Sequence, residues 1–290
     1  MSLVSVVIPT HNRSKYIERA IASVLTQTYA DLEAIVVDDG SADDTARVVD
    51  AYARKDSRIR LIQHDRRKGA QAARNTGIFA ATGKWIAFLD SDDEWLQDSL
   101  ALRLQLAEEG RLQVVHSECY VANEGSTEMR RFGAPALHGW IYQDLLRKTG
   151  TVFPSLLVLK ECLKRIGYLD ETILAYQEWD TSIRLAKYYQ FGFVSEPTFL
   201  YDCRHVDTIS KDLLREAKGY EQVFTKHSWS IFRLLGPEAL VQHYQIAADF
   251  YFQAKDEDNA RRCLMKAFML WPFRPRTILR GIQRLLRSGF

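Results

Sequence analysis

Two pairs of carboxylate side chains stand directly after short apolar runs in the first hundred residues. Asp38 and Asp39 follow one run, and Asp90 and Asp92 follow another. Gathering that many carboxylates at one edge of a protein is costly unless a cation or hydrogen-bond donors compensate. Two acidic strand ends that converge therefore predict a ligand site.

The chemistry of such a site follows from its oxygen donors. Carboxylates of this kind select a hard divalent ion, Mg²⁺ or Mn²⁺, which keeps coordination positions open for phosphate oxygens. Asp90 and Asp92 are two residues apart, so their side chains oppose each other in an extended chain and a turn at Ser91 is needed to bring them together. An ion there would stabilise the negative charge that develops on a diphosphate leaving group.

The elements that carry these residues alternate between two periodicities. Apolar runs predict strands over residues 3–8, 33–37, 59–62 and 85–89, and helical spacing predicts helices over 16–25, 41 to about 55 and 70–81. Ser41 and Asp44 have the spacing of a capping box, Asp43 or Asp44 suits a helix N-cap, and Gly83 suits a C-cap. Short connections predict βαβ units and a parallel sheet, which binds ligands beyond the carboxyl ends of its strands.

The rest of the chain divides near residue 211. Strand signals at 113–115, 152–159 and 193–201 are separated by helical segments near 142–147 and 181–189, which we interpret as the acceptor-facing half of the same domain. After residue 211 the pattern is helical. The sequence thus predicts one α/β domain over residues 1–211, mostly a parallel sheet flanked by helices, and an all-α region over 212–290.

The all-α region contains two features with more than one interpretation. A tetratricopeptide-like spacing predicts either an interaction repeat or an ordinary helical hairpin, and it comprises Tyr244, Ala248, Tyr251, Ala260, Leu264, Ala267 and Pro272. Residues 273–290 carry five arginines and no acid, with Ile278, Ile282, Leu285 and Leu286 on one helical face. This segment predicts either a contact with an anionic membrane surface or packing on the helical bundle.

Four segments resemble those of glycosyltransferase family 2 in the order and spacing of that family, and the likeness covers roughly residues 3–210. The segments are Val6-Val7-Ile8-Pro9-Thr10-His11-Asn12-Arg13, Val37-Asp38-Asp39-Gly40-Ser41-Ala42-Asp43-Asp44-Thr45, Ala73-Arg74-Asn75-Thr76-Gly77 and Phe88-Leu89-Asp90-Ser91-Asp92-Asp93. Four linked motifs are highly specific, where a lone Asp-x-Asp would be weak. The resemblance implies the GT-A fold and transfer of a sugar from a nucleotide-sugar.

The resemblance also implies roles for individual residues. Thr10, Asp39 and Arg74 would contact the base and ribose, with Asp38 supporting them. Asp92 would be the main ligand of Mn²⁺ or Mg²⁺, and Asp90 would reach the ribose or the metal. The remaining nucleotide-sugar contacts are expected at Pro9, Asn12, Arg13 and Ser91.

Two later segments match the acceptor side of that family. The family usually has Glu-Asp where this chain has Gln177-Glu178, so Glu178 takes the position of the general base and Asp180 is the fallback. The segment Tyr201-Asp202-Cys203-Arg204-His205 resembles the motif that closes over the diphosphate, with His205 as a metal or pyrophosphate contact. The implied reaction is inverting transfer of a hexose-type sugar, by family frequency from a UDP-sugar, to a glycan or lipid-linked acceptor in cell-surface polysaccharide synthesis.

Other functional classes fit less well. The turn after the first strand lacks the glycines of a dinucleotide-binding dehydrogenase, and the glycine-rich basic loop of a sugar nucleotidyltransferase is absent. The alternative left open is a catalytically weak sugar-nucleotide-binding scaffold that acts through its C-terminal helices, which Gln177-Glu178 favours.

Composition narrows the setting. Hydrophobic residues make up 47% and charged residues 26%, as in soluble globular proteins, and a net charge of +2 argues against nucleic acid as the partner. Four scattered cysteines, no secretory signal and no apolar run of bilayer length predict a cytoplasmic protein, with the basic tail as a peripheral membrane contact. A monomer and an oligomer are both compatible with the sequence.

Overall fold

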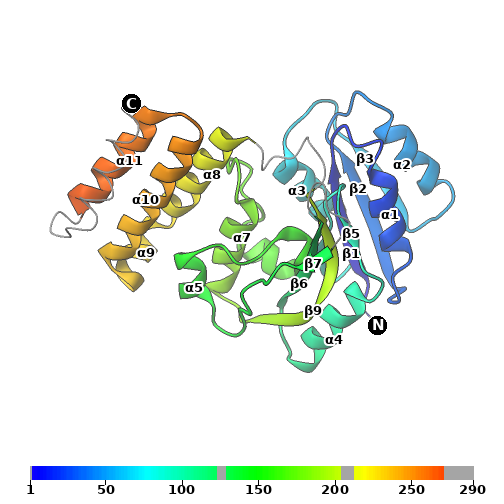
Figure 1. Cartoon of the computed structure of the whole chain (residues 1–290). Helices are drawn as coiled ribbons and strands as arrows, with labels where there is room; N and C mark the ends of the chain where they lie inside the picture. The colour runs from blue at the N-terminus through cyan, green and yellow to red at the C-terminus, as the bar shows by residue number, and fades with distance from the viewer. Residues whose placement is uncertain (1, 123–128, 204–211, 271–290) are drawn as a thin grey trace. The chain divides into compact units, whose positions relative to one another are not determined.

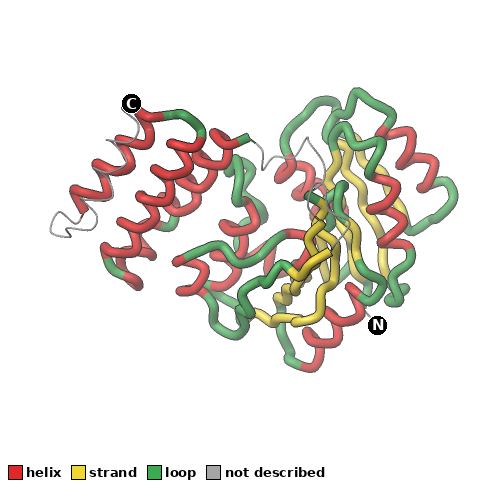
Figure 2. The backbone as a smooth tube through the Cα atoms, viewed as in Figure 1, coloured by secondary structure: helices red, strands yellow, loops and turns green. Residues whose placement is uncertain are grey.

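The computed structural model describes residues 2–122, 129–203 and 212–270 (Figures 1 and 2). The chain forms two compact units that are interleaved in sequence. The first comprises Met1–Tyr142, Gly150–Glu171 and Glu178–Val206, and the second comprises Gln143–Thr149, Thr172–Gln177 and Asp207–Phe290. Two short segments before residue 211 therefore belong to the mainly helical second unit.

The first unit is built on a sheet that has nine strands within the described residues. These are β1 (Val4–Thr10), β2 (Leu32–Asp38), β3 (Ile59–Gln63), β4 (Trp85–Phe88), β5 (Glu94–Trp95), β6 (Val114–Ala122), β7 (Met129–Arg131), β8 (Leu157–Leu159) and β9 (Phe191–Asp202). Their order is β3-β2-β1-β4-β8-β6-β9-β5, with β7 pairing β6. The pairs among β1–β4 and the β6–β9 pair are parallel, and the others are antiparallel.

Helices cover both faces of the parallel half. They are α1 (Ile17–Leu25), α2 (Thr45–Ala53) and α3 (Ala70–Ala80), and Figure 1 shows α1 and α2 on one side of these strands and α3 on the other. Right-handed crossovers require this arrangement, because the strand order reverses between β3 and β4. Every residue of β1 and β2 is buried, as expected of strands covered on both faces. A Cβ on Gly77 would lie 2.4 Å from Cγ1 of Val7, so the glycine lets α3 approach β1 closely.

The second half of the sheet is mixed. The helices here are α4 (Ser99–Glu109) and α6 (Lys160–Arg165). Two further helices, α5 (Tyr142–Arg147) and α7 (Gln177–Ala186), each have residues that belong to both units. The strand predicted over 152–159 is wrong in its first half: Phe153–Ser155 form a 3₁₀ turn with Pro154 in its first positions, and only Leu157–Leu159 pair as β8. The helix predicted over 181–189 begins four residues earlier.

Two predicted helix ends are also wrong. Helix α2 begins at Thr45 and not at Ser41, because the Ser41 hydroxyl donates to Asp38 and does not cap the helix. The predicted capping box is therefore absent. Helix α3 ends before Ala81, whose backbone is extended. Gly83 instead lies where a Cβ would meet the Leu3 carbonyl oxygen at 2.7 Å, so it serves close approach to the start of β1.

The second unit contains four further helices within the described residues: α8 (Leu213–Lys226), α9 (Ser228–Leu235), α10 (Pro237–Gln253) and α11 (Glu257–Leu270). The predicted hairpin is present as α10 and α11, which bury the small side chains Ala248, Ala260 and Ala267 between them. Buried His243 ties this unit together, since its ring contacts the Tyr220 hydroxyl at 2.8 Å and the Leu146 carbonyl at 2.9 Å. Pro272 and the basic tail 273–290 lie outside the described residues. None of the described helices is long and apolar enough to cross a membrane.

Candidate active site

The ends of three parallel strands meet at one edge of the sheet. Thr10, the last residue of β1, pairs in register with Asp38, the last residue of β2, and Val7 pairs with Phe88 at the end of β4. Because β1 lies between β2 and β4, the polar residues that follow these strands share one rim, as the sequence predicts.

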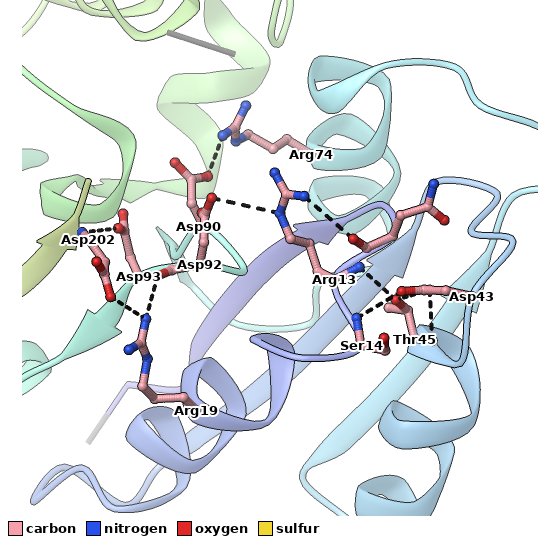
Figure 3. Close-up of polar contacts among 11 residues, drawn as sticks. Arg13, Ser14, Arg19, Asp43, Thr45, Arg74, Asp90, Asp92, Asp93 and Asp202 are labelled. Atoms are coloured by element: carbon pink, nitrogen blue, oxygen red, sulfur yellow. Dashed lines mark hydrogen bonds and ion pairs between the residues drawn. The ribbon is translucent and has the colours of Figure 1, made fainter. Parts of the chain in front are cut away.

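The acidic segment after β4 forms a turn. The amide of Asp93 donates to the Asp90 carbonyl oxygen at 3.1 Å, which supplies the turn predicted at Ser91. Arg74 of α3 donates through Nη2 to Oδ1 of Asp90, and Nε of Arg13 lies 3.8 Å from Oδ2 of Asp92 (Figure 3). The Asp90 and Asp92 side chains remain 30% and 21% exposed. Each carboxylate thus faces an arginine and still presents surface to a ligand.

Arg74 is held firmly in this arrangement. Its side chain is buried, it donates to Oε1 of Gln71 at 3.1 Å, and its guanidinium carbon lies 4.1 Å from the centroid of the Phe153 ring. Desolvated cation–π contacts and hydrogen bonds of this kind restrict a long side chain to one orientation. Arg74 is therefore a preorganised positive group at the acidic turn.

Asp38 and Asp39 are buried at the end of β2 and differ in their partners. Asp38 accepts from the amide and hydroxyl of Ser41. Asp39 accepts from the amides of Lys68 and Gly69, both at 2.7 Å, and lies 2.8 Å from Nδ1 of His64. Burial alone would raise the pKa of Asp39, but these hydrogen bonds outweigh it and the pKa is lowered. Asp39 thus organises the loop after β3. Its direct contact with the base or ribose of a nucleotide stays a prediction.

The first strand ends in a polar loop with one uncommitted group. The Thr10 hydroxyl is buried and has no hydrogen-bond partner among the described residues, which is unusual unless a ligand supplies one. Pro9 is buried within β1, where it pairs with Val37. Asn12 has a positive φ of 53° and links two loops, with its amide donating to the Ser41 hydroxyl at 2.8 Å and its side chain accepting from the Ala42 amide at 2.9 Å.

Asp43 anchors the loop that carries Arg13. Its carboxylate accepts from the Ser14 amide at 3.1 Å and from the Thr45 amide at 3.0 Å, and the Thr45 hydroxyl in turn accepts from the Arg13 amide at 2.8 Å. The N-cap position of α2 is Asp44, whose side chain makes no capping hydrogen bond and pairs with Arg47 on the surface. Asp43 lies one residue earlier and accepts from the amide of Thr45, the first helical residue. Burial raises the pKa of Asp43, but the hydrogen bonds from Thr45 and Ser14 together outweigh it and lower the pKa to about 2.

We expect D43N to lower the free energy of unfolding by about 1 kcal/mol near neutral pH, because the amide keeps one acceptor but loses the charge that strengthens the hydrogen bonds from Ser14 and Thr45, and solvent screens part of that effect. Because the folded pKa lies below the unfolded one, this contribution is present above about pH 4 and is lost as the pH falls towards 2. Urea unfolding of both proteins across this range should show their difference shrinking towards acid. A difference that grows on acidification would contradict the assignment.

Asp93, the last residue of the acidic turn, contacts Asp202 at the end of β9. Oδ1 of the buried Asp93 accepts from the Asp202 amide at 3.0 Å, and Oδ2 has no partner within the described residues. Burial, followed by the charges of Asp90 and Asp92, raises the pKa of Asp93. Burial also raises the pKa of Tyr201, and the carboxylates of Asp93, Asp90 and Glu178 add to that effect. The phenol of Tyr201 therefore lies in the field of both the acidic turn and Glu178.

The two candidate bases on α7 differ in their surroundings. Asp180 is buried and pairs with Nε of Arg184 at 2.8 Å, and Arg184 also donates to the Ile166 and Tyr168 carbonyls at 2.8 and 2.6 Å. A carboxylate committed to such a network is poorly suited to accept a proton from an acceptor. Glu178 is partly exposed, which favours it as the base. Its neighbour Gln177 is buried and donates to the Ile173 carbonyl at 2.8 Å, within the second unit.

The donor set suits a hard divalent ion. Mg²⁺ is commonly held by one or two carboxylates together with phosphate oxygens, and the partly exposed Asp90 and Asp92 offer two carboxylates from one turn. Within residues 2–122, 129–203 and 212–270, no group of three or more His, Cys, Asp or Glu side chains is arranged to hold a metal ion. The third expected ligand, His205, lies outside the described residues.

Three residues at this rim were not singled out by the sequence: His64, Arg19 and Asp202, the last noted only as part of a motif. A lone histidine after a strand and a lone arginine on an amphipathic helix are ordinary surface features. Only their contacts with residues distant in sequence distinguish them from such features. Nη2 of Arg19, for example, donates to Oδ2 of Asp202 at 2.8 Å.

Comparison with known proteins identifies the family. Residues 5–157, just over half of the chain, match the family model described as glycosyl transferase family 2. A UDP-Glc:alpha-D-GlcNAc-diphosphoundecaprenol beta-1,3-glucosyltransferase of Escherichia coli, WfgD, is 37% identical over 148 residues, which are 51% of this chain and 56% of that protein. The chain spans between a quarter and just over half of the length of the first curated relatives that it matches.

Solved structures agree on the fold. S. aureus TarS in complex with UDP-GlcNAc superposes with a TM-score of 0.63 at 19% identity, covering 91% of this chain and 90% of that one. The mannosyltransferase PcManGT of Pyrobaculum calidifontis in complex with GDP-Man and Mn²⁺ superposes with a TM-score of 0.61 at 18% identity, covering 94% and 88%. The expected GT-A fold is confirmed, although the sheet predicted to be mostly parallel is mixed, with four parallel and four antiparallel strand pairs among the described residues. The family model matches more than half of this chain, and the chain therefore belongs to glycosyltransferase family 2.

Proposed function

We propose that the protein is an inverting glycosyltransferase that binds a nucleotide-sugar at the rim formed by β1, β2 and β4. One observation carries the proposal: Asp90 and Asp92 share a turn, remain partly exposed, and face Arg74 and Arg13 from two other elements. A diphosphate with its divalent ion requires both signs of charge within a few ångströms. The uncommitted Thr10 hydroxyl supports a bound nucleotide at the same rim.

Each residue has a proposed task. Asp92 and Asp90 would hold Mn²⁺ or Mg²⁺, with His205 as a further contact. A bound ion would stabilise charge on the departing diphosphate. Arg74 and Arg13 would bind the nucleotide and its phosphates, beside Thr10, Asp38 and Asp39. Relatives support this chemistry, since WfgD is named for a UDP-Glc donor and PcManGT was solved with GDP-Man and Mn²⁺.

The proposed reaction is a single displacement. Glu178 accepts the proton of an acceptor hydroxyl, whose oxygen forms a bond to the anomeric carbon as the bond to the diphosphate oxygen breaks. The nucleoside diphosphate leaves with the bonding electron pair, and the configuration inverts. For the acceptor we propose a glycan or lipid-linked saccharide in cell-surface polysaccharide synthesis, by likeness to WfgD, which is named for a diphosphoundecaprenol acceptor. A contact of residues 273–290 with anionic membrane is part of this proposal.

Donor binding can be tested by thermal unfolding of the full chain with UDP-Glc, UDP-GlcNAc and GDP-Man, each with and without Mn²⁺. A ligand at 100 times its Kd stabilises the native state by about 2.7 kcal/mol, so we expect one donor to raise Tm by several degrees, and more with Mn²⁺. The absence of any nucleotide-sugar response would contradict the proposal. Binding without Mn²⁺-dependent hydrolysis of the donor would favour the scaffold alternative.

A further inference from the structure

The guanidinium group of Arg19 connects three segments around the acidic turn. Arg19 lies on α1, and its Nη2 donates to the carbonyl oxygen of Asp92 and to Oδ2 of Asp202, both at 2.8 Å (Figure 3). Its Nε lies 3.6 Å from Oε2 of Glu94. One side chain therefore contacts the backbone of the main candidate metal ligand and the end of a strand in the other half of the sheet.

A second hydrogen bond joins the acidic turn to the same residue of β9, Asp202. The Asp202 amide donates to Oδ1 of Asp93 at 3.0 Å, while the Asp202 carboxylate accepts from Arg19. Residues 92 and 93 are thus tied to one residue of β9 through two independent hydrogen-bond routes. Asp202 is 110 residues from Asp92 in sequence, so this arrangement exists only in the folded chain.

The chemistry of the pair indicates more than stabilisation. The Asp202 side chain is fully buried and forms an ion pair with Arg19, and a neutral pair of similar shape commonly stabilises a fold as well as a buried ion pair does. What a neutral pair would lose is the charged donor on the Asp92 carbonyl. That carbonyl lies inside the turn closed by the Asp93–Asp90 hydrogen bond, so a shift of this peptide group would also move the backbone from which the Asp92 carboxylate projects.

We propose that Arg19 is a positioning residue for the divalent ion. Arg19 acts by holding the Asp92 backbone against β9 through Asp202. The inference rests on the proposed function, in which Asp92 is the main metal ligand. Residues that orient metal ligands typically change metal affinity 10- to 100-fold when removed. Arg19 would therefore set how much Mn²⁺ the donor complex requires.

The test compares R19Q, D202N and R19Q/D202N in the full chain. R19Q is expected to lower the ligand-free Tm, because it leaves the Asp202 charge buried without its cation. The double variant removes both charges and is expected to recover Tm. It should still need about ten times more Mn²⁺ than the unsubstituted protein for the half-maximal rise in Tm with UDP.

A matched control is available on α2. Arg54 and Asp50 form an exposed pair at 2.7 Å, so R54Q/D50N makes the same two chemical changes away from the rim and should leave the Mn²⁺ requirement unchanged. If R19Q/D202N recovers both Tm and the Mn²⁺ requirement, the pair is only structural and the inference is overturned. If the unsubstituted protein shows no Mn²⁺-dependent response to UDP or to the donors above, the proposed function fails instead.

Discussion

D92N is expected to lower sugar transfer by roughly 100- to 1,000-fold, the usual cost of losing one electrostatic contact to a developing anion. Asparagine keeps the size of the side chain but removes the charge that would hold the ion. The fold should persist, because the contact between Asp92 and Arg13 is long, at 3.8 Å, and partly exposed. Initial rates of nucleoside diphosphate release across a Mn²⁺ series, beside thermal unfolding, would measure both effects.

D50N provides the comparison for this variant. Asp50 is an exposed carboxylate of α2 that pairs with Arg54, so the same substitution there should change neither the rate nor its metal dependence. Wild-type turnover by D92N at every Mn²⁺ concentration would remove Asp92 from the mechanism.

E178Q is expected to lower kcat by about 100- to 10,000-fold, the range attributed to a lost general base. Glutamine cannot accept the hydroxyl proton, but it occupies nearly the same volume. Donor binding should change little, because Glu178 would act on the acceptor and not on the nucleotide. Single-turnover rates and donor-dependent Tm shifts would separate these two effects.

D180N should behave differently, because Asp180 is buried and its carboxylate belongs to the Arg184 network. Removing one partner of a buried ion pair costs on the order of 3 kcal/mol, so the main effect should be a lower Tm. If D180N lowers kcat more than E178Q while its Tm stays unchanged, the base is Asp180 and our assignment is wrong.

The elements nearest the rim follow from local signals, and the misassigned ones show where such signals end. Apolar runs predicted β1–β4 to within two residues at either end. β1, β2 and β4 are buried throughout, and strands covered on both faces can hold little else, whereas β3 lies at the edge of the sheet and is partly exposed. Ser41 has the residue type and spacing of a helix cap, yet its hydroxyl donates to the carboxylate of Asp38 in the fold and does not cap α2. The segment before β8 has strand composition, but Pro154 cannot donate to a neighbouring strand and falls in a 3₁₀ turn.

The sequence by itself determined which polar residues follow the strands, and parallel pairing then places them at one rim. It also determined that carboxylates and arginines occur there together. Only the tertiary structure decided which charge meets which: Arg74 with Asp90, Arg13 with Asp92, and Arg19 with Asp202 across 183 residues of sequence. Hydrophobic periodicity is a local property of the chain, whereas the partner of a charged side chain depends on which distant backbone packs beside it.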